Sequence, residues 1–263
     1  MTPTRLALSF LFLASLLVPT AAPAKEPRAA ADAKPLTRDA SLAGFRYLVF
    51  ETGHAKPGQS LPLIVGLHYS SAQPETMLGY FDSIDFPARV VLPQGAYPRR
   101  GGYSWFPSDY AQRSAAEQTA VTLRAEQTLS DFVAAAAAKY PTRGKPVVMG
   151  ISYGGDLAFL LAIRHPNQFR ASFPVAARFL PAWMPDRNRC QPHCPPIRAM
   201  HGDRDKTVPM APTLDATKRL REMGFDVELQ PYAGGTHDFD ARMQRDFSAK
   251  ARDFLAPTAP RPH

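Results

Sequence analysis

The sequence GISYGG occupies residues 150–155 and is the segment that most constrains the fold. It follows a short apolar run at residues 146–149 and leads into an apolar segment at residues 155–164, which predicts a strand, a sharp turn and a helix. In such a turn the glycines avoid clashes with nearby backbone, and the serine side chain is pushed out into solvent. An ordinary glycine-rich turn is the alternative, but the flanking strand and helix favour Ser152 as a nucleophile.

Strands and helices alternate along most of the chain. Apolar runs rich in β-branched and aromatic residues predict strands at residues 45–51, 61–67, 89–92, 146–150, 170–176, 197–201 and 225–232. Apolar residues at helical spacing predict helices at residues 114–139, 155–164, 214–223 and 238–254. This alternation is typical of the α/β class, with a mostly parallel central sheet and helices on both faces. Ligands of such sheets bind at the carboxyl ends of the strands.

The ends of the chain predict export and flexible segments around one domain. Residues 1–24 have Arg5, an apolar run of roughly a dozen residues and small residues up to Ala24, which is typical of a signal peptide cleaved after Ala24. The run is shorter than the about twenty residues that a membrane span needs. Residues 25–41 predict a flexible leader, residues 42–255 a single α/β domain and residues 256–263 a frayed end. We therefore expect a periplasmic or secreted protein.

The formal net charge is +8, but the basic residues are scattered along the sequence. We find no nucleic-acid-binding element, and no nucleic-acid partner is predicted. A loose attraction to anionic lipid or substrate is one interpretation of the charge. Ordinary solubility charge is the interpretation that we favour, because no long basic run is present.

The two cysteines, Cys190 and Cys194, lie close together in the sequence CQPHC. Because an exported protein meets an oxidising compartment, we expect them to form a disulfide. So short a loop adds little stability, so the disulfide would shape the chain locally. His193 lies between them and allows a metal site, but a zinc ion would need a fourth ligand that is not evident nearby. We predict no metal.

A serine nucleophile needs a base and a carboxylate that orients it. His237 follows the last predicted strand, and Asp203 and Asp205 follow the strand before it, so all three are expected at the same edge of the sheet as Ser152. Either aspartate alone is more often a turn former, and a loop histidine is often only exposed. The order serine, aspartate, histidine favours His237 as the base and Asp205 as its partner. Asp238 is interpreted as an acid at a helix start.

The oxyanion of a tetrahedral intermediate needs hydrogen-bond donors. The turn at Ser152 supplies the backbone N–H of Tyr153, and the loop after the strand that ends at Leu67 would supply a second N–H, from Tyr69 or Ser70. The sequence does not choose between these two. His68 comes before the nucleophile, so we expect it to be a structural hydrogen-bonding residue.

Several short motifs in the chain resemble the phospholipase/carboxylesterase family of α/β-hydrolases, in particular its bacterial esterase branch. These motifs are LHY at 67–69, LP at 92–93, GGYSWF at 101–106, GISYGG at 150–155, RHP at 164–166, HGDRDKTVP at 201–209 and GTH at 235–237. The resemblance implies a triad of Ser152, Asp205 and His237, no metal or organic cofactor, and a small-molecule or lipid-like ester or thioester as substrate. It also implies that Trp105 and Phe106 lie near the mouth of the substrate pocket. The alternative is that these two aromatic residues cover the core under a long loop.

The sequence thus predicts a serine hydrolase that cleaves carboxylic esters or thioesters through an acyl-enzyme on Ser152. One alternative is a serine peptidase of the prolyl-oligopeptidase type, although the chain has no room for a propeller domain. A second is a non-catalytic binding protein with the α/β-hydrolase fold, which the complete set of serine, aspartate and histidine argues against. The oligomeric state is not predicted.

Overall fold

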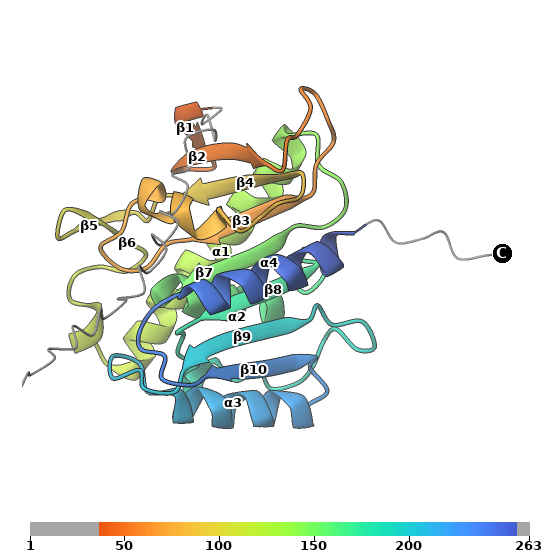
Figure 1. Cartoon of the computed structure of the whole chain (residues 1–263). Coiled ribbons are helices and arrows are strands. Elements are labelled where there is room, and N and C mark those ends of the chain that lie inside the picture. Colours follow the sequence, from red (N-terminus) through yellow and green to blue (C-terminus); the bar gives the residue numbers. More distant parts are fainter. Residues whose placement is uncertain (1–36, 257–263) are drawn as a thin grey trace, which may run out of the picture.

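The computed structural model describes residues 37–256. The predicted signal peptide at residues 1–24, the leader up to residue 36 and the tail at residues 257–263 lie outside the described residues. An eight-stranded sheet runs through the domain in the order β1-β2-β4-β3-β7-β8-β9-β10 (Figure 1). Its strands are β1 (Thr37–Leu42), β2 (Phe45–Thr52), β3 (Leu63–Leu67), β4 (Ala88–Pro93), β7 (Val147–Ile151), β8 (Ala171–Val175), β9 (Ile197–Gly202) and β10 (Val227–Tyr232).

Most neighbouring strands pair in parallel, as the sequence predicts. All pairs from β4 to β10 are parallel, whereas β1 with β2 and β2 with β4 are antiparallel. Every residue of β3, β4, β7 and β8 is buried, because helices cover both sides of the sheet. The carboxyl ends of the parallel strands therefore meet at one edge.

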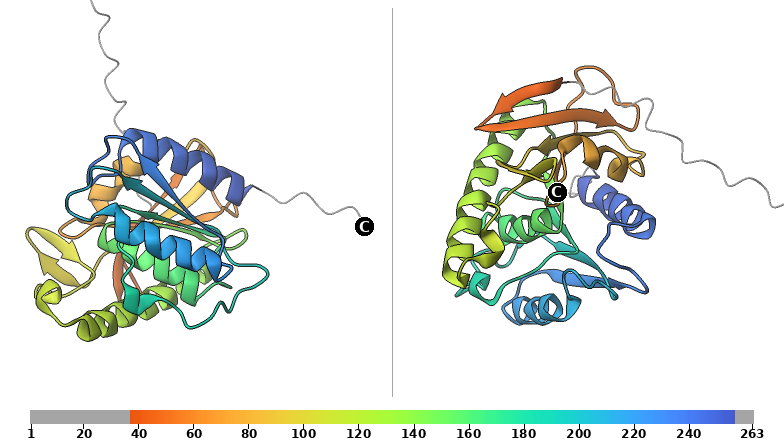
Figure 2. Two further views of the ribbon diagram at one scale, coloured as in Figure 1. Left: turned by 90° about the horizontal axis from the view of Figure 1, so that it is seen from below. Right: turned by 90° about the vertical axis from the view of Figure 1, so that its left-hand side faces the viewer.

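Helices cover both faces of the sheet. They are α1 (Ala115–Lys139), α2 (Tyr153–Arg164), α3 (Met210–Glu222) and α4 (Ala241–Leu255), together with the 3-10 helix η1 (Pro74–Phe81). Helix α4 and η1 pack on one face, and α1, α2 and α3 pack on the other (Figure 2). Within the described residues, no helix has both the length and the apolar character that a membrane crossing requires. The predicted α/β class with two covered faces is confirmed.

The first strand corrects the predicted flexible leader, because β1 begins at Thr37 inside the segment 25–41. Residues 37–41 therefore belong to the sheet. Ala43 and Gly44 both have positive φ angles and turn the chain so that Leu42 pairs with Phe45. Two such residues form the tight turn of a β-hairpin. The sequence gives no apolar signal for this strand, because an edge strand is held by backbone hydrogen bonds, which need no apolar pattern.

Other differences from the predicted elements are local. Helix α3 begins at Met210, four residues before the predicted start, because Pro212 lies in its first turn, where a missing N–H costs no hydrogen bond. Between the predicted strand at residues 89–92 and the predicted helix at residues 114–139, the structure contains a short hairpin of β5 (Tyr97–Arg99) and β6 (Gly102–Ser104). The predicted disulfide between Cys190 and Cys194 is present in the segment before β9.

The core under α4 gives a test of the packing. Phe247 is fully buried, and its ring contacts the rings of Phe81, Phe173 and Phe239. We expect Phe247→Ala to lower the free energy of unfolding by about 3–5 kcal/mol, because a cavity replaces an aromatic ring between helix and sheet. Urea unfolding followed by circular dichroism measures this. The exposed Tyr97 is the control, since Tyr97→Ala should change stability by no more than about 0.5 kcal/mol; equal losses in both variants would contradict the described core.

Candidate active site

Ser152 lies on the sharp turn between β7 and α2. Its φ of 55° and ψ of −119° put a non-glycine residue at positive φ, a strained conformation. A Cβ atom at Gly150 would lie 2.1 Å from the carbonyl oxygen of Gly154, and one at Gly154 would lie 2.3 Å from the carbonyl oxygen of Leu67. Both positions therefore require glycine, for the steric reason that the sequence pattern indicated.

Three loops at the carboxyl edge of the sheet bring together Ser152, His237 and Asp205. The Oγ atom of Ser152 lies 3.1 Å from Nε2 of His237, and Nδ1 of His237 lies 2.7 Å from Oδ2 of Asp205. The Asp205 side chain is fully buried, whereas that of His237 is 24% exposed. Nδ1–H of the ring donates to the carboxylate, so Nε2 is free to accept the serine proton. The three residues have the geometry of a nucleophile, a base and an orienting acid.

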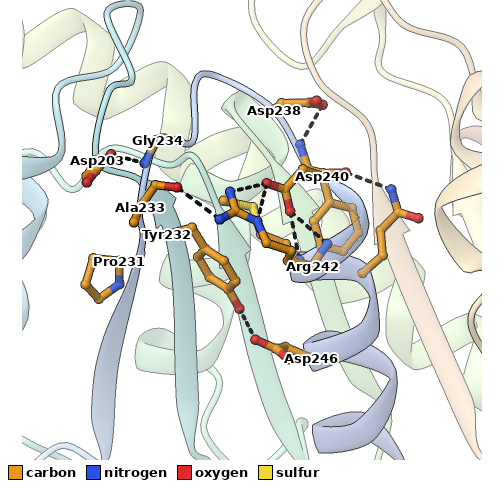
Figure 3. Close-up of polar contacts among 12 residues, drawn as sticks. Asp203, Pro231, Tyr232, Ala233, Gly234, Asp238, Asp240, Arg242 and Asp246 are labelled. Carbon is orange, nitrogen blue, oxygen red and sulfur yellow. Dashed lines mark hydrogen bonds and ion pairs between the residues drawn. The ribbon is translucent and has the colours of Figure 1, made fainter. Parts of the chain in front are cut away.

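The two candidate aspartates have different partners. Oδ1 of Asp205 accepts hydrogen bonds from the backbone N–H groups of Thr207 and Val208, at 2.9 and 2.8 Å, and Oδ2 faces the histidine. Oδ1 of Asp203 accepts from the N–H of Gly234 at 2.8 Å (Figure 3). Asp203 thus ties together the two loops that carry Asp205 and His237. The geometry favours Asp205 as the partner of the histidine, as expected from the sequence.

The loop that carries His237 is held at both ends (Figure 3). Where β10 ends, the hydroxyl of Tyr232 donates to Oδ2 of Asp246 at 2.6 Å, and burial raises the pKa of this tyrosine. Where α4 begins, Asp240 accepts from the first N–H groups of the helix, and its Oδ2 pairs with the Arg242 guanidinium. Arg242 also donates to the carbonyl of Ala233 at 2.9 Å. These contacts join the two ends of the loop.

Asp238 does not start helix α4, so that prediction was wrong. The helix begins at Ala241, and Asp240 is its N-cap. Oδ1 of Asp238 instead accepts from the N–H of Phe239 at 2.7 Å, and the residue lines the cavity beside His237. The cap is displaced because Asp240, two residues later, can bond to the N–H groups of the first helical turn.

His68 has the structural role that we expected. Its ring donates from Nδ1 to the carbonyl of Tyr69 at 2.8 Å, and Nε2 accepts from the N–H of Gly95 at 2.9 Å. The ring also stacks on Trp105, with 4.6 Å between the ring centroids. Burial lowers the pKa of His68 from 6.5 to about 4, so the ring is neutral near pH 7. His68 therefore fixes the loop that follows β3.

Trp105 and Phe106 do not lie at the pocket mouth, which corrects the expectation from the resemblance. Trp105 is 3% exposed, and its indole N–H donates to the carbonyl of His68 at 2.7 Å. Phe106 is fully buried and packs against the rings of Tyr110 and Tyr153. Neither residue lines the cavity at Ser152. Both residues follow the β5–β6 hairpin and pack into the core. This agrees with the alternative interpretation of the sequence, in which the two aromatic residues cover the core under a loop.

A cavity of about 560 Å³ opens beside Ser152. Its wall includes the residues predicted to surround the oxyanion, Tyr69, Ser70 and Tyr153. The N–H of Ser71 is already bonded to the carbonyl of Tyr103, which leaves Tyr69 and Ser70 as the candidates in that loop. Tyr153 is the first residue of α2, where backbone N–H groups have no partner within the helix.

The cavity wall also contains residues that sequence reasoning missed. Tyr80 comes from η1, Arg99 and Arg100 from the β5–β6 hairpin, and Arg178 from the segment after β8. For Arg178 a signal was present, because it follows a strand whose carboxyl end lies at the functional edge. Nothing in the sequence marks the other three. Among the residues that the structure describes, no group of three or more His, Cys, Asp or Glu side chains is arranged to hold a metal ion.

A mostly parallel sheet with a serine on a strand-to-helix turn, beside a histidine and a buried aspartate, defines an α/β-hydrolase. The sequence profile of the Dienelactone hydrolase family matches residues 90–256, and the chain belongs to this family. The chain is therefore a carboxylic ester hydrolase by class. The predicted superfamily and enzyme class are confirmed, and the family that matches is that of the dienelactone hydrolases. No curated protein matches the chain.

Solved structures of esterases share this fold. Esterase PE8 superposes with a TM-score of 0.64 at 22% sequence identity, over 78% of this chain and 99% of that chain. The carboxylesterase of Bacillus cereus gives a TM-score of 0.61 at 15% identity, over 80% and 94%. The carboxylesterase from Mesorhizobium loti gives 0.62 at 20% identity, over 86% and 99%. At these identities the likeness is one of fold.

The lowered pKa of His68 predicts how stability depends on pH. Between about pH 4 and pH 6.5 the unfolded chain binds a proton at this ring and the folded chain does not, so stability falls as the pH falls through this range. The loss from His68 should reach about 3 kcal/mol at the acidic end. Urea unfolding at a series of pH values measures it in the wild type and in His68→Gln.

In His68→Gln this part of the pH dependence should be absent, while the part due to other groups remains. His54→Gln is the matched control, because His54 is exposed, and it should keep the wild-type dependence. Stability that falls with pH as steeply in His68→Gln as in the wild type would show that the buried ring is not the source.

Proposed function

We propose that this protein hydrolyses carboxylic esters or thioesters through an acyl-enzyme on Ser152. The observation that carries the proposal is the continuous hydrogen-bonded chain from Ser152 Oγ through the His237 ring to Asp205, with distances of 3.1 and 2.7 Å. A serine hydroxyl is a weak nucleophile until a base removes its proton, and this arrangement supplies the base. Membership in a family named for the hydrolysis of a lactone, a cyclic ester, supports the same chemistry.

Each residue has a defined part in the proposed reaction. Nε2 of His237 accepts the proton as Ser152 Oγ attacks the acyl carbonyl, and the same ring then protonates the leaving group. Asp205 holds the ring tautomer and stabilises the imidazolium. The N–H of Tyr153, with that of Tyr69 or Ser70, donates to the oxyanion. Water then attacks the acyl-enzyme by the same steps, and none of them requires a metal or organic cofactor.

The cavity suggests the size and chemistry of the substrate. A volume of about 560 Å³ suits a small-molecule or lipid-like ester, and the wall contains both tyrosine rings and polar side chains. We also infer that the protein acts outside the cytoplasm, because the disulfide between Cys190 and Cys194 is stable in oxidising compartments. The periplasm and the extracellular medium both meet this condition.

Replacing the nucleophile tests the proposal directly. Ser152→Ala removes the attacking oxygen and should lower kcat for a p-nitrophenyl ester by several orders of magnitude, as the loss of a nucleophile generally does. The wild type should also react covalently with a fluorophosphonate probe, and the variant should not. Unchanged turnover in the variant would overturn the mechanism, and a wild type inert to the probe would favour a binding protein. Comparing the ester with the matching p-nitroanilide distinguishes an esterase from a peptidase.

The two aspartates allow a matched comparison. Asp205→Asn keeps the shape of the side chain but removes the charge behind His237 and favours the wrong ring tautomer, so kcat should fall on the order of 10⁴-fold. Asp203→Asn keeps an oxygen that can accept from the N–H of Gly234, so its kcat should stay within a few-fold of the wild type. Steady-state kinetics with the same ester measures both. The assignment is wrong if Asp203→Asn is the more damaging change.

A further inference from the structure

Arg178 brings a guanidinium into the wall of the cavity that contains Ser152. The residue follows β8, and its side chain is 25% exposed. The proposed triad chemistry does not use it.

Three kinds of contact fix the orientation of the guanidinium. Its Nε and Nη2 atoms donate to Oδ2 of Asp156 at 3.0 and 2.7 Å, and the backbone N–H of Arg178 donates to Oδ1 at 2.7 Å. Asp156 is fully buried in the first turn of α2, four residues after Ser152. The guanidinium carbon also lies over the rings of Tyr153 and Tyr110, at 5.0 and 5.7 Å from their centroids. Such cation–π contacts hold the plane of the group in place.

The ion pair between Asp156 and Arg178 is not explained by stability alone. Burying two charges costs desolvation energy, and well-packed apolar residues in place of such a pair are often neutral or stabilising. Burial accordingly raises the pKa of Asp156, while the charge of Arg178 acts in the opposite direction. The pair lies one helical turn from the nucleophile, where the backbone N–H of Asp156 donates to the carbonyl of Ser152 at 2.9 Å. This location indicates a function in the site.

The guanidinium retains unused hydrogen-bond donors. Two of its five N–H groups donate to Asp156, and Tyr110 is a further hydrogen-bond partner of the side chain, so N–H groups remain that these partners do not use. The hydroxyl of Tyr110 donates to that of Thr122 at 2.8 Å, since the Thr122 hydroxyl itself donates to the carbonyl of Gln118, and the Tyr110 oxygen can therefore accept from the guanidinium. Because Asp156 balances the charge, the group offers directed N–H donors more than a net positive charge. Such a donor suits an uncharged oxygen atom.

We propose that Arg178 is a specificity-determining residue, which donates a hydrogen bond to a second oxygen acceptor of the substrate, apart from the ester that is cleaved. Suitable acceptors are a ketone, a hydroxyl group or a further ester carbonyl on the acyl part. The proposal rests on the function proposed for Ser152 and narrows its substrate class to oxygen-bearing acyl esters. Because a rigid donor loses little entropy on binding, we expect the enzyme to prefer esters with such an acceptor strongly over esters without one.

Two p-nitrophenyl esters of equal chain length test the proposal, the 4-oxopentanoate and the pentanoate. Each kcat/KM is divided by the rate of hydrolysis by hydroxide, which removes differences in intrinsic reactivity. The wild type should prefer the oxo ester by about tenfold or more, as expected for a hydrogen bond from a charged donor. In Asp156→Asn/Arg178→Met the methionine keeps bulk against the rings but has no N–H group, so the preference should disappear. Arg178→Lys, which keeps the charge beside Asp156 but not the planar fork, gives a second variant if the first does not fold.

Two control variants show whether the preference belongs to Arg178. Glu51→Gln/Arg89→Gln removes a pair of similar burial on β2 and β4, away from the cavity, and should keep the preference. Arg99→Gln/Arg100→Gln removes the two hairpin arginines and should also keep it. Equal rates on the two esters in the wild type, or a preference lost only when the hairpin arginines are replaced, would overturn the proposal. Turnover of the pentanoate itself, compared between the wild type and Ser152→Ala, reports separately on the proposed function.

Discussion

The hydrogen bond between the buried carboxylate of Asp205 and the ring of His237 is the interaction on which the rest of the site depends. A buried carboxylate is stable only when its oxygens have partners, and here two backbone N–H groups and the ring provide them. The two loops that carry these residues are joined by Asp203 and Gly234, and the ends of the second loop are fixed by the contacts of Arg242. The ring is therefore aimed at Ser152 before any substrate binds, which is what rapid proton transfer requires.

The loop after β3, which forms another part of the cavity wall, is also held in place by buried hydrogen bonds. The neutral ring of His68 is bonded on both sides, to Tyr69 and Gly95, and Trp105 covers it and bonds to its backbone. The loop after β3 is thus held by buried groups, although it lies at the edge of the cavity. On the neighbouring turn, Tyr153 is held by Arg178 and Phe106. Rigid support on both sides lets a short loop present backbone N–H groups in fixed positions.

The sequence predicted those parts of the molecule whose signals are local. The turn at Ser152 is flanked by a strand and a helix, and the loops with Asp205 and His237 each follow a strand, so their meeting at one edge follows from topology. Trp105 and Phe106 were misplaced because a motif does not say on which side of the backbone a ring will pack. Strand β1 was missed because backbone pairing leaves no apolar pattern. Arg178 acquires its role only from Asp156 and two aromatic rings, contacts that depend on the folded chain.

The positive φ of Ser152 has a consequence for how this protein can change. A glycine there would relieve the backbone strain, yet it would remove the oxygen on which the proposed chemistry depends. Thermal stability and turnover therefore favour different residues at position 152. Selection for thermal stability alone would favour inactive variants at this position. A screen that also requires ester cleavage must find stabilising substitutions elsewhere in the domain.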